Sequence, residues 1–339
     1  MALMSWRGLA AVGATVAGAA GAAVTAKVVA DRGRTRRRLR RGDDAAFGSL
    51  HATPIRVMAD DGVSLNVEVD EVDDDARDGA PTVVFVHGWV LDLNCWHYQR
   101  AALRGHHRLV LYDQRSHGNS GRSDREHATL EQLGDDLRAV LDAVAPSGPV
   151  VLVGHSMGGM SVMAFAKKYP DVVRERVSGV VLMGTSAGEL VGGGRSFLSR
   201  TQPVLVNGLS KLTFLVDQAR KVNSYALTKR FAVGPHTPEK YADMTDEMIS
   251  GAPTHLFWDF YPNFTSLDLF DALGVLKGDT TLVIGATHDQ LTVYKHSRRL
   301  AEEIQGSELV TIEGAGHMMM LEAHELVNEA LIELLDRVA

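Results

Sequence analysis

The stretch Val150-Val151-Leu152-Val153-Gly154-His155-Ser156-Met157-Gly158-Gly159 decides how this chain folds. Its first four residues are apolar, which predicts a buried strand, and apolar residues at helical spacing follow over Met160–Tyr169. A strand that turns this sharply into a helix crowds its own backbone, so glycine is needed at Gly154 and Gly158. The turn leaves the Ser156 hydroxyl exposed above a helix N-terminus. This context favours a nucleophilic serine over a Gly-rich turn without chemistry.

Two later strand ends offer partners for this serine. The run Glu308–Ile312 predicts a short strand, and His317 follows it on a Gly-rich loop. The run Thr281–Gly285 predicts another strand, and Asp289 follows that one. A histidine there could take the serine's proton, and a carboxylate could fix its tautomer and stabilise its charged form. The simpler alternatives, a surface histidine and an Asx turn or helix N-cap, fit these positions after strands less well.

The chain order Ser156, Asp289, His317 resembles that of the α/β-hydrolases. The resemblance covers roughly residues 54–337 and is closest to the esterase/lipase-like group with a helical cap. It implies a Ser-His-Asp catalytic triad made of these three residues.

A fourth motif extends the resemblance to the N-terminal half. Thr82–Val86 predicts a strand that runs into His87-Gly88-Trp89, which resembles the strand followed by HG-x in this family. The resemblance implies that the backbone N–H groups of Trp89 and Met157 form the oxyanion hole, with His87 and Gly88 in a supporting role. Two amides aimed at one point stabilise developing negative charge by about 3 kcal/mol per donor.

The segment Asp113–Ser120 resembles the family's D-x-R-G-x-G-x-S loop, with Ser116 in place of the usual glycine. We interpret it as structural: Asp113 and Arg115 would tie this loop together beside the serine turn. The serine at position 116 puts the backbone geometry of the loop in question, but not the chemistry.

Alternating strands and helices predict an α/β fold with a mostly parallel, doubly wound sheet, the α/β-hydrolase fold, and an inserted helical cap. The other expected elements are an opening hairpin, two strands and two helices: Ile55–Met58 with Ser64–Val69, His107–Tyr112, Val177–Met183, Leu130–Ala143 and Leu321–Val338. The predicted parts are an N-terminal arm (1–45), a hydrolase core (46–185 and 267–339) and the cap (186–266).

The predicted cap is rich in large apolar residues that could line an acyl pocket. We expect about a third of them to touch substrate and the rest to hold the cap helices together. An apolar lid excludes water and favours hydrophobic acyl groups. The candidates are Phe197, Leu205, Leu212, Phe214, Phe231, Met244, Met248, Phe257, Trp258 and Phe260.

The cysteine content and the absence of several motifs exclude other classes of protein. The single cysteine, Cys95, rules out an intramolecular disulfide framework and a Cys-rich zinc site, and we expect it to be a buried structural residue. The chain has no Walker loop, dinucleotide-binding motif or H-E-x-x-H zinc motif. We therefore predict no cofactor and no metal. The oligomeric state is left open.

The N-terminal arm carries a charge opposite to that of the remaining chain. Nine Lys/Arg and one Asp give residues 1–41 a net charge of +8, so the remainder carries −15 of the total −7. Residues 9–26 lack charge and precede a run of arginines at 32–41. A membrane anchor through 9–41 with a cytoplasmic catalytic domain is favoured. A cleaved signal peptide of a secreted protein, or a disordered tail on a soluble cytoplasmic one, stays open. The acidic remainder argues against nucleic-acid binding.

These observations predict a serine hydrolase that cleaves a small-molecule carboxylic ester through an acyl-enzyme on Ser156. Long-chain lipase activity, cofactor-free perhydrolysis and C–C bond hydrolysis use the same triad and stay open. A non-catalytic ligand-binding protein on this fold is the alternative from another class. Epoxide hydrolases and haloalkane dehalogenases of this family use an aspartate where Ser156 stands, which disfavours both.

Overall fold

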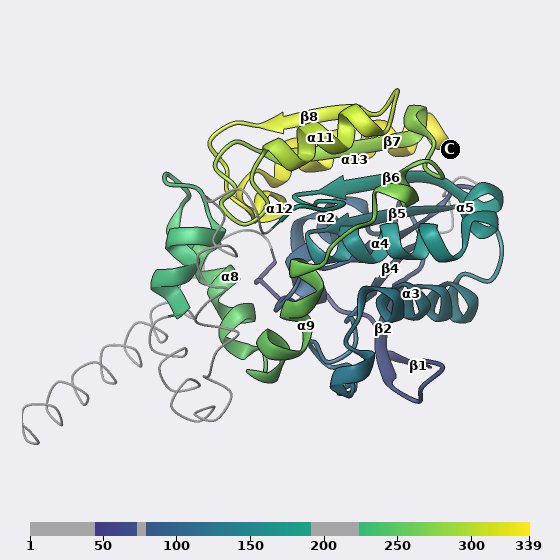
Figure 1. Cartoon of the computed structure of the whole chain (residues 1–339), viewed down its shortest axis with the longest axis horizontal. Coiled ribbons are helices and arrows are strands. Elements are labelled where there is room, and N and C mark those ends of the chain that lie inside the picture. Colours follow the sequence, from purple (N-terminus) through teal and green to yellow (C-terminus); the bar gives the residue numbers. More distant parts are fainter. Residues whose placement is uncertain (1–44, 73–78, 191–223) are drawn as a thin grey trace, which may run out of the picture.

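The computed structural model describes residues 45–72, 79–190 and 224–339. Their strands form one eight-stranded sheet in the order β1-β2-β4-β3-β5-β6-β7-β8 (Figure 1). β2 pairs antiparallel with β1 and with β4, and every other pairing is parallel. The strands are β1 Ile55–Met58, β2 Ser64–Asp70, β3 Thr82–Val86, β4 Leu109–Tyr112, β5 Val150–His155, β6 Val177–Met183, β7 Thr281–Ala286 and β8 Glu308–Ile312.

Helices cover both faces of the sheet (Figure 1). In β3, Val84 and Val86 pack into the core beneath α3 and α4, whereas Val83 and Phe85 pack into the core beneath α2 and α13. A strand buried on both faces needs an unbroken apolar run, which is what the central strands have. The helices of the core are α2 His97–Leu103, α3 Leu130–Val144, α4 Met157–Lys168, α5 Pro170–Arg176, α11 Lys295–Glu303, α12 Met319–Glu322 and α13 His324–Val338.

The structure confirms the predicted fold class and corrects several boundaries. The strand expected over His107–Tyr112 begins at Leu109, and the helix after the serine turn begins at Met157 rather than at Met160. The single closing helix expected over Leu321–Val338 is two helices, because the backbone of Ala323 leaves the helical region at φ −132° and ψ 41°.

Between β6 and β7 the described chain is helical, with no strand in residues 224–265. We call this part the β6–β7 segment. It contains a π-helical turn over Thr228–Ala232 (η4), α8 Glu239–Gly251 and α9 His255–Thr265, and the short α10 Phe270–Leu273 follows it. Four of the expected pocket residues (Phe197, Leu205, Leu212 and Phe214) lie outside the described residues.

The N-terminal arm is not among the described residues, which begin at position 45. Within the described ranges, no helix has the length and apolar character needed to cross a membrane.

Candidate active site

Ser156 occupies a tight turn between β5 and α4. Its backbone has φ 53° and ψ −120°, a left-handed conformation that costs a non-glycine residue about 1–3 kcal/mol. Two hydrogen bonds hold the turn: the Ser156 N–H donates to the Met183 carbonyl at 2.9 Å, and the Thr185 hydroxyl donates to the Ser156 carbonyl at 2.7 Å. Met183 is the last residue of β6, and Thr185 lies two residues after it. The neighbouring strand therefore supports the strained serine.

Glycine is required at both flanking positions because backbone atoms fill the space of a side chain. A Cβ on Gly158 would lie 2.0 Å from the Val86 carbonyl oxygen, and one on Gly154 would lie 2.7 Å from the Gly158 oxygen. The end of β3 thus presses directly against the first turn of α4.

His317 and Asp289 meet at the carboxyl ends of β7 and β8. Asp289 Oδ2 lies 2.8 Å from His317 Nδ1, and both side chains are buried. The other carboxylate oxygen, Oδ1, accepts the N–H groups of Leu291 and Thr292 at 2.8 and 2.9 Å. Asp289 therefore makes an Asx turn and also bonds the imidazole, so the two roles that the sequence left as alternatives coexist in one side chain.

Thr292 and His155 add contacts that sequence reasoning did not assign. The Thr292 hydroxyl lies 2.9 Å from Asp289 Oδ2 and 2.6 Å from the Gly184 carbonyl, and its one proton serves one of these acceptors at a time. His155 Nε2 donates to the His317 carbonyl at 2.9 Å. Burial holds the pKa of His155 well below its ordinary value, so a neutral ring lies beside His317. The only sequence signal for His155 is its place inside G-x-S-x-G.

The two residues expected to supply the oxyanion donors both belong to segments next to Ser156. Met157 is the first residue of α4, where backbone N–H groups have no acceptor within the helix. Trp89 follows β3, and a Cβ on its neighbour Gly88 would lie 3.2 Å from Ser156 Cβ. The segment that carries the Trp89 amide therefore lies against the serine.

His87 is structural. Its Nδ1 donates to the Gly88 carbonyl at 2.7 Å, and its Nε2 accepts the Gln114 N–H at 2.9 Å. Burial lowers the pKa of His87 to about 4, so the ring is neutral and serves as both donor and acceptor. These bonds join the segment that carries Trp89 to the Asp113–Ser120 loop.

The Trp89 side chain connects the same segment to α9. Its Nε1 donates to the Leu256 carbonyl at 3.1 Å. Its ring packs between those of Phe257 and Phe264, with both centroids 5.0 Å away. The backbone amide expected in the oxyanion hole is thus held by a side chain anchored on the β6–β7 segment.

The Asp113–Ser120 loop keeps its shape despite the serine. Ser116 adopts φ 66°, the conformation that a glycine would take without strain. Asp113 accepts the Leu93 and Asn119 N–H groups, whereas Arg115 points elsewhere. The two residues are therefore both structural, but they do not bond each other.

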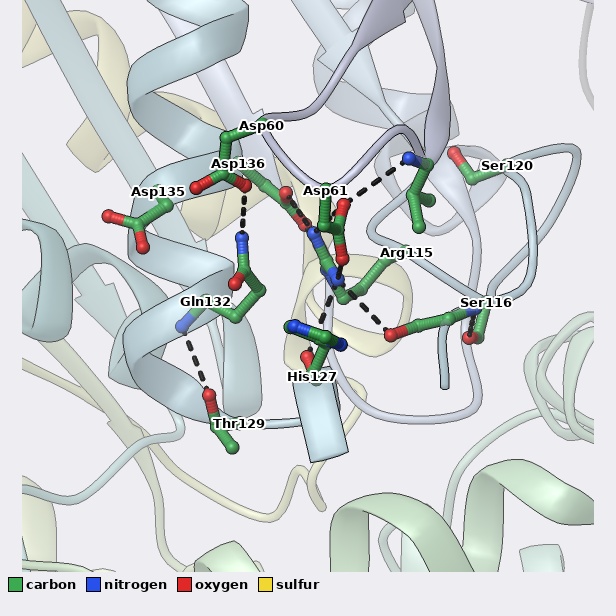
Figure 2. Close-up of polar contacts among 12 residues, drawn as sticks. Asp60, Asp61, Arg115, Ser116, Ser120, His127, Thr129, Gln132, Asp135 and Asp136 are labelled. Atoms are coloured by element: carbon green, nitrogen blue, oxygen red, sulfur yellow. Dashed lines mark hydrogen bonds and ion pairs between the residues drawn. The ribbon is translucent and has the colours of Figure 1, made fainter. Parts of the chain in front are cut away.

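Arg115 instead bridges three parts of the core. Its guanidinium bonds both oxygens of Asp136 on α3 at 2.6 Å and reaches Asp61, in the turn between β1 and β2, at 2.6 Å (Figure 2). Burial lowers the pKa of Arg115, but the bonds to Asp136 and Asp61 outweigh it and leave the pKa raised. This network fixes the loop whose Gln114 bonds His87.

Ser156 and His317 open into the same cavity, which has a volume of about 160 Å³. None of its described lining residues is Asp, Glu, Lys or Arg, and most are aliphatic or aromatic. Of the six expected pocket residues that the structure describes, Phe231 and Phe257 line it. The lining residues are Trp89, Val90, Leu91, Ser156, Met160, Leu190, Ser224, Leu227, Thr228, Phe231, Ala232, Ile249, Phe257, Phe264, Leu291, Thr292, His317 and Met318.

Neither Cys95 nor a metal cluster competes with Ser156 within the described ranges. Cys95 is buried, and burial raises its pKa well above the ordinary value, so it is not a ready thiolate. In the part of the chain that the structure describes, no group of three His, Cys, Asp or Glu side chains could hold a metal ion.

Comparison with known proteins gives related hydrolases along most of the chain. The chain is 26% identical over 274 residues to a bifunctional esterase/perhydrolase of Acinetobacter calcoaceticus, covering 75% of this chain and 91% of that protein. It is also 26% identical over 278 residues to a 2-hydroxy-6-oxononadienedioate/2-hydroxy-6-oxononatrienedioate hydrolase of Escherichia coli, covering 78% and 90%.

Solved structures share the fold. An esterase from Exiguobacterium antarcticum superposes with a TM-score of 0.67 at 21% identity, covering 84% of this chain and 100% of its own. A thermophilic esterase from Thermogutta terrifontis gives 0.64 at 24% identity, covering 85% and 99%. The sequence profile of the alpha/beta hydrolase family matches residues 83–330. The chain is therefore a hydrolase and belongs to the alpha/beta hydrolase family.

Proposed function

We propose that this hydrolase cleaves carboxylic esters of neutral, apolar acyl groups through an acyl-enzyme on Ser156. One observation carries the proposal: Ser156 and His317 line one cavity whose described lining has no Asp, Glu, Lys or Arg, and Asp289 bonds Nδ1 of the imidazole. A base oriented by a carboxylate beside a serine that opens into a cavity is the arrangement that acyl transfer needs.

The reaction proceeds in two halves. Ser156 Oγ attacks the acyl carbonyl and His317 takes its proton, while the amides of Trp89 and Met157 stabilise the oxyanion. His317 then gives that proton to the leaving alcohol, which departs and leaves the acyl group on Ser156. In the second half, His317 takes a proton from water, the hydroxide attacks the acyl-enzyme, and the acid leaves as Ser156 recovers its proton.

The cavity also bears on the substrate. Its volume of about 160 Å³ is of the size that an aromatic ring or a short acyl chain fills. Its described lining contains no Lys or Arg to pair with a carboxylate, which argues against anionic acyl groups. We expect kcat/KM on p-nitrophenyl esters to peak at short or aromatic acyl groups and to fall for long chains.

A fluorophosphonate probe tests the nucleophile directly. We expect the wild type to be labelled, and Ser156→Ala to lose both labelling and, by a factor on the order of 10⁶, kcat on esters. Ser266→Ala, at an exposed serine, serves as the matched control and should be labelled normally. Labelling that persists in Ser156→Ala would exclude Ser156 as the nucleophile. A wild type that binds esters without turnover would support a ligand-binding role instead.

Perhydrolysis is the second candidate reaction, because the relative from Acinetobacter calcoaceticus is a bifunctional esterase/perhydrolase. Hydrogen peroxide in place of water would attack the same acyl-enzyme and release a peracid. Peracid formation from a short-chain ester at millimolar peroxide, abolished by Ser156→Ala, would support it. The E. coli relative is named for a dianionic substrate, to which a described lining without Lys or Arg is poorly suited.

For residues 9–41 we propose association with an anionic membrane surface, with the catalytic domain on the cytoplasmic side. The support is the net charge of +8 in residues 1–41 against −15 in the remainder, together with the uncharged stretch 9–26. Fractionation of the full chain and of a chain lacking residues 1–41 tests this. We expect only the full chain in the membrane fraction, and its complete recovery in the soluble fraction would refute the proposal.

A further inference from the structure

Glu322, the last residue of α12, collects hydrogen bonds from two separate parts of the site. Its carboxylate accepts the N–H groups of Gly316 and Met318, each at 3.1 Å. These two residues flank His317 on either side. The carboxylate also accepts the Gly234 N–H at 2.7 Å and the Thr237 hydroxyl, both in the turn that follows η4.

The two parts joined by Glu322 also touch directly. The Met318 N–H donates to the Ala232 carbonyl at 3.1 Å. A Cβ on Gly316 would lie 2.4 Å from the Val233 carbonyl carbon, and one on Gly234 would lie 2.3 Å from the Gly314 oxygen. The backbones of the histidine loop and of the turn after η4 are therefore in van der Waals contact, with glycine on both sides.

The residues on either side of this contact line the catalytic cavity. Thr228, Phe231 and Ala232 of η4 form part of its wall, and His317 and Met318 form another part. A shift of the turn after η4 would therefore move the cavity wall and the imidazole together.

An ionised carboxylate suits this position better than any neutral side chain. It is acceptor-only and offers two oxygens, which matches four converging donors. Burial raises the pKa of Glu322, and its four donors offset part of that cost. A glutamine would keep one acceptor oxygen and turn its NH₂ group toward N–H donors.

We propose that Glu322 is a positioning residue that joins the His317 loop to residues 228–237 as one unit and so keeps the imidazole aimed at Ser156. The inference rests on the proposed esterase function for its kinetic consequence, but the joining of the two segments is independent of it.

Hydrogen–deuterium exchange of the full-length protein tests the joining. In Glu322→Ala, amides in 313–320 and in 228–238 should both exchange faster than in the wild type. Thr237→Val, which removes a single donor, should show a smaller effect in the same two regions. Glu325→Gln, an exposed glutamate on α13, is the control and should change neither. Faster exchange confined to one region, or to none, would overturn the proposal.

Ester kinetics test the positioning. We expect kcat to fall by about 10- to 100-fold in Glu322→Ala with KM changed less than about threefold, because a misplacement of about 1 Å costs up to this much. Glu322→Gln, which keeps one acceptor, should recover part of the loss. An unchanged kcat in Glu322→Ala, with exchange raised in both regions, would refute the positioning role. If the wild type cleaves no ester, the proposed function fails, and exchange alone decides whether Glu322 joins the two segments.

Discussion

At the scale of single residues, the two carboxylate oxygens of Asp289 have different partners, which separates its structural bonds from the catalytic role proposed for it. Oδ1 closes the Asx turn through Leu291 and Thr292, and Oδ2 bonds His317. A substitution that preserves one oxygen and changes the other can separate the two tasks.

Asp289→Asn is that substitution. The amide oxygen can still accept the turn amides, whereas the NH₂ group facing His317 would favour the wrong tautomer of the imidazole. We expect kcat on esters to fall by a factor on the order of 10⁴, with the melting temperature within about 4 °C of the wild type. Asp279→Asn, at an exposed aspartate, should leave both unchanged. Retention of more than a tenth of wild-type kcat would contradict a catalytic role for Asp289.

At the scale of elements, the turn from β5 into α4 depends on glycine more strictly than any other local feature of the site. Gly158 faces the carbonyl groups of Val86 and His87 at the end of β3, so its missing side chain lets strand and helix touch.

Gly158→Ala is expected to destabilise the protein by at least about 3 kcal/mol, because a methyl group 2.0 Å from a backbone oxygen forces β3 and α4 apart. Urea unfolding measures this. The control is Gly251→Ala at the end of α8, where a Cβ meets nothing within 4 Å. Equal stabilities of the two variants would show that the β3–α4 contact adjusts freely.

Some strand boundaries could be predicted from the sequence, whereas the order of the strands in the sheet could not. Buried parallel strands are largely apolar runs, so Thr82–Val86 and Val177–Met183 could be predicted to the residue. The insertion of β3 between β4 and β5 depends on long-range pairing, which no local pattern records. The break at Ala323 likewise depends on what packs around α12.

The residues of the candidate site also differ in whether the sequence points to them. Strand ends that meet at one edge of a parallel sheet gave a physical reason to group Ser156, Asp289 and His317. Glu322 carries no such signal, because a glutamate in an amphipathic helix ordinarily faces water. Two of its four donors, Gly234 and Thr237, lie 88 and 85 positions earlier in the chain, and no local pattern links them to Glu322.

At the scale of the whole molecule, buried neutral histidines couple stability to pH. Burial lowers the pKa of His87 to about 4 and that of His117 to about 3, and both rings are fully buried. In the unfolded chain these rings take up protons near their ordinary pKa of 6.5. The unfolded state therefore binds more protons below pH 6.5, and stability is lost as the pH falls toward 4.

Urea unfolding at pH 7, 5.5 and 4.5 should show this loss, worth up to about 3 kcal/mol per ring at the acid end. His117→Gln removes one of the two rings and should give a shallower pH dependence. His106→Gln, at an exposed histidine, should follow the wild type. A slope that is the same in all three proteins would assign the acid sensitivity to other groups.

The residues that line the cavity are spread along the chain, which affects when the cavity can form during synthesis. The cavity's described walls come from residues as far apart as Trp89 and Met318, so the chain must be synthesised as far as Met318 before the pocket can close. A ribosome-bound chain that ends with β8 would lack His317 and Met318 and would leave the rest of the apolar wall uncovered. Such an intermediate is a natural substrate for chaperones. During refolding, ester hydrolysis should therefore return after the helical signal, as one of the last properties to be regained.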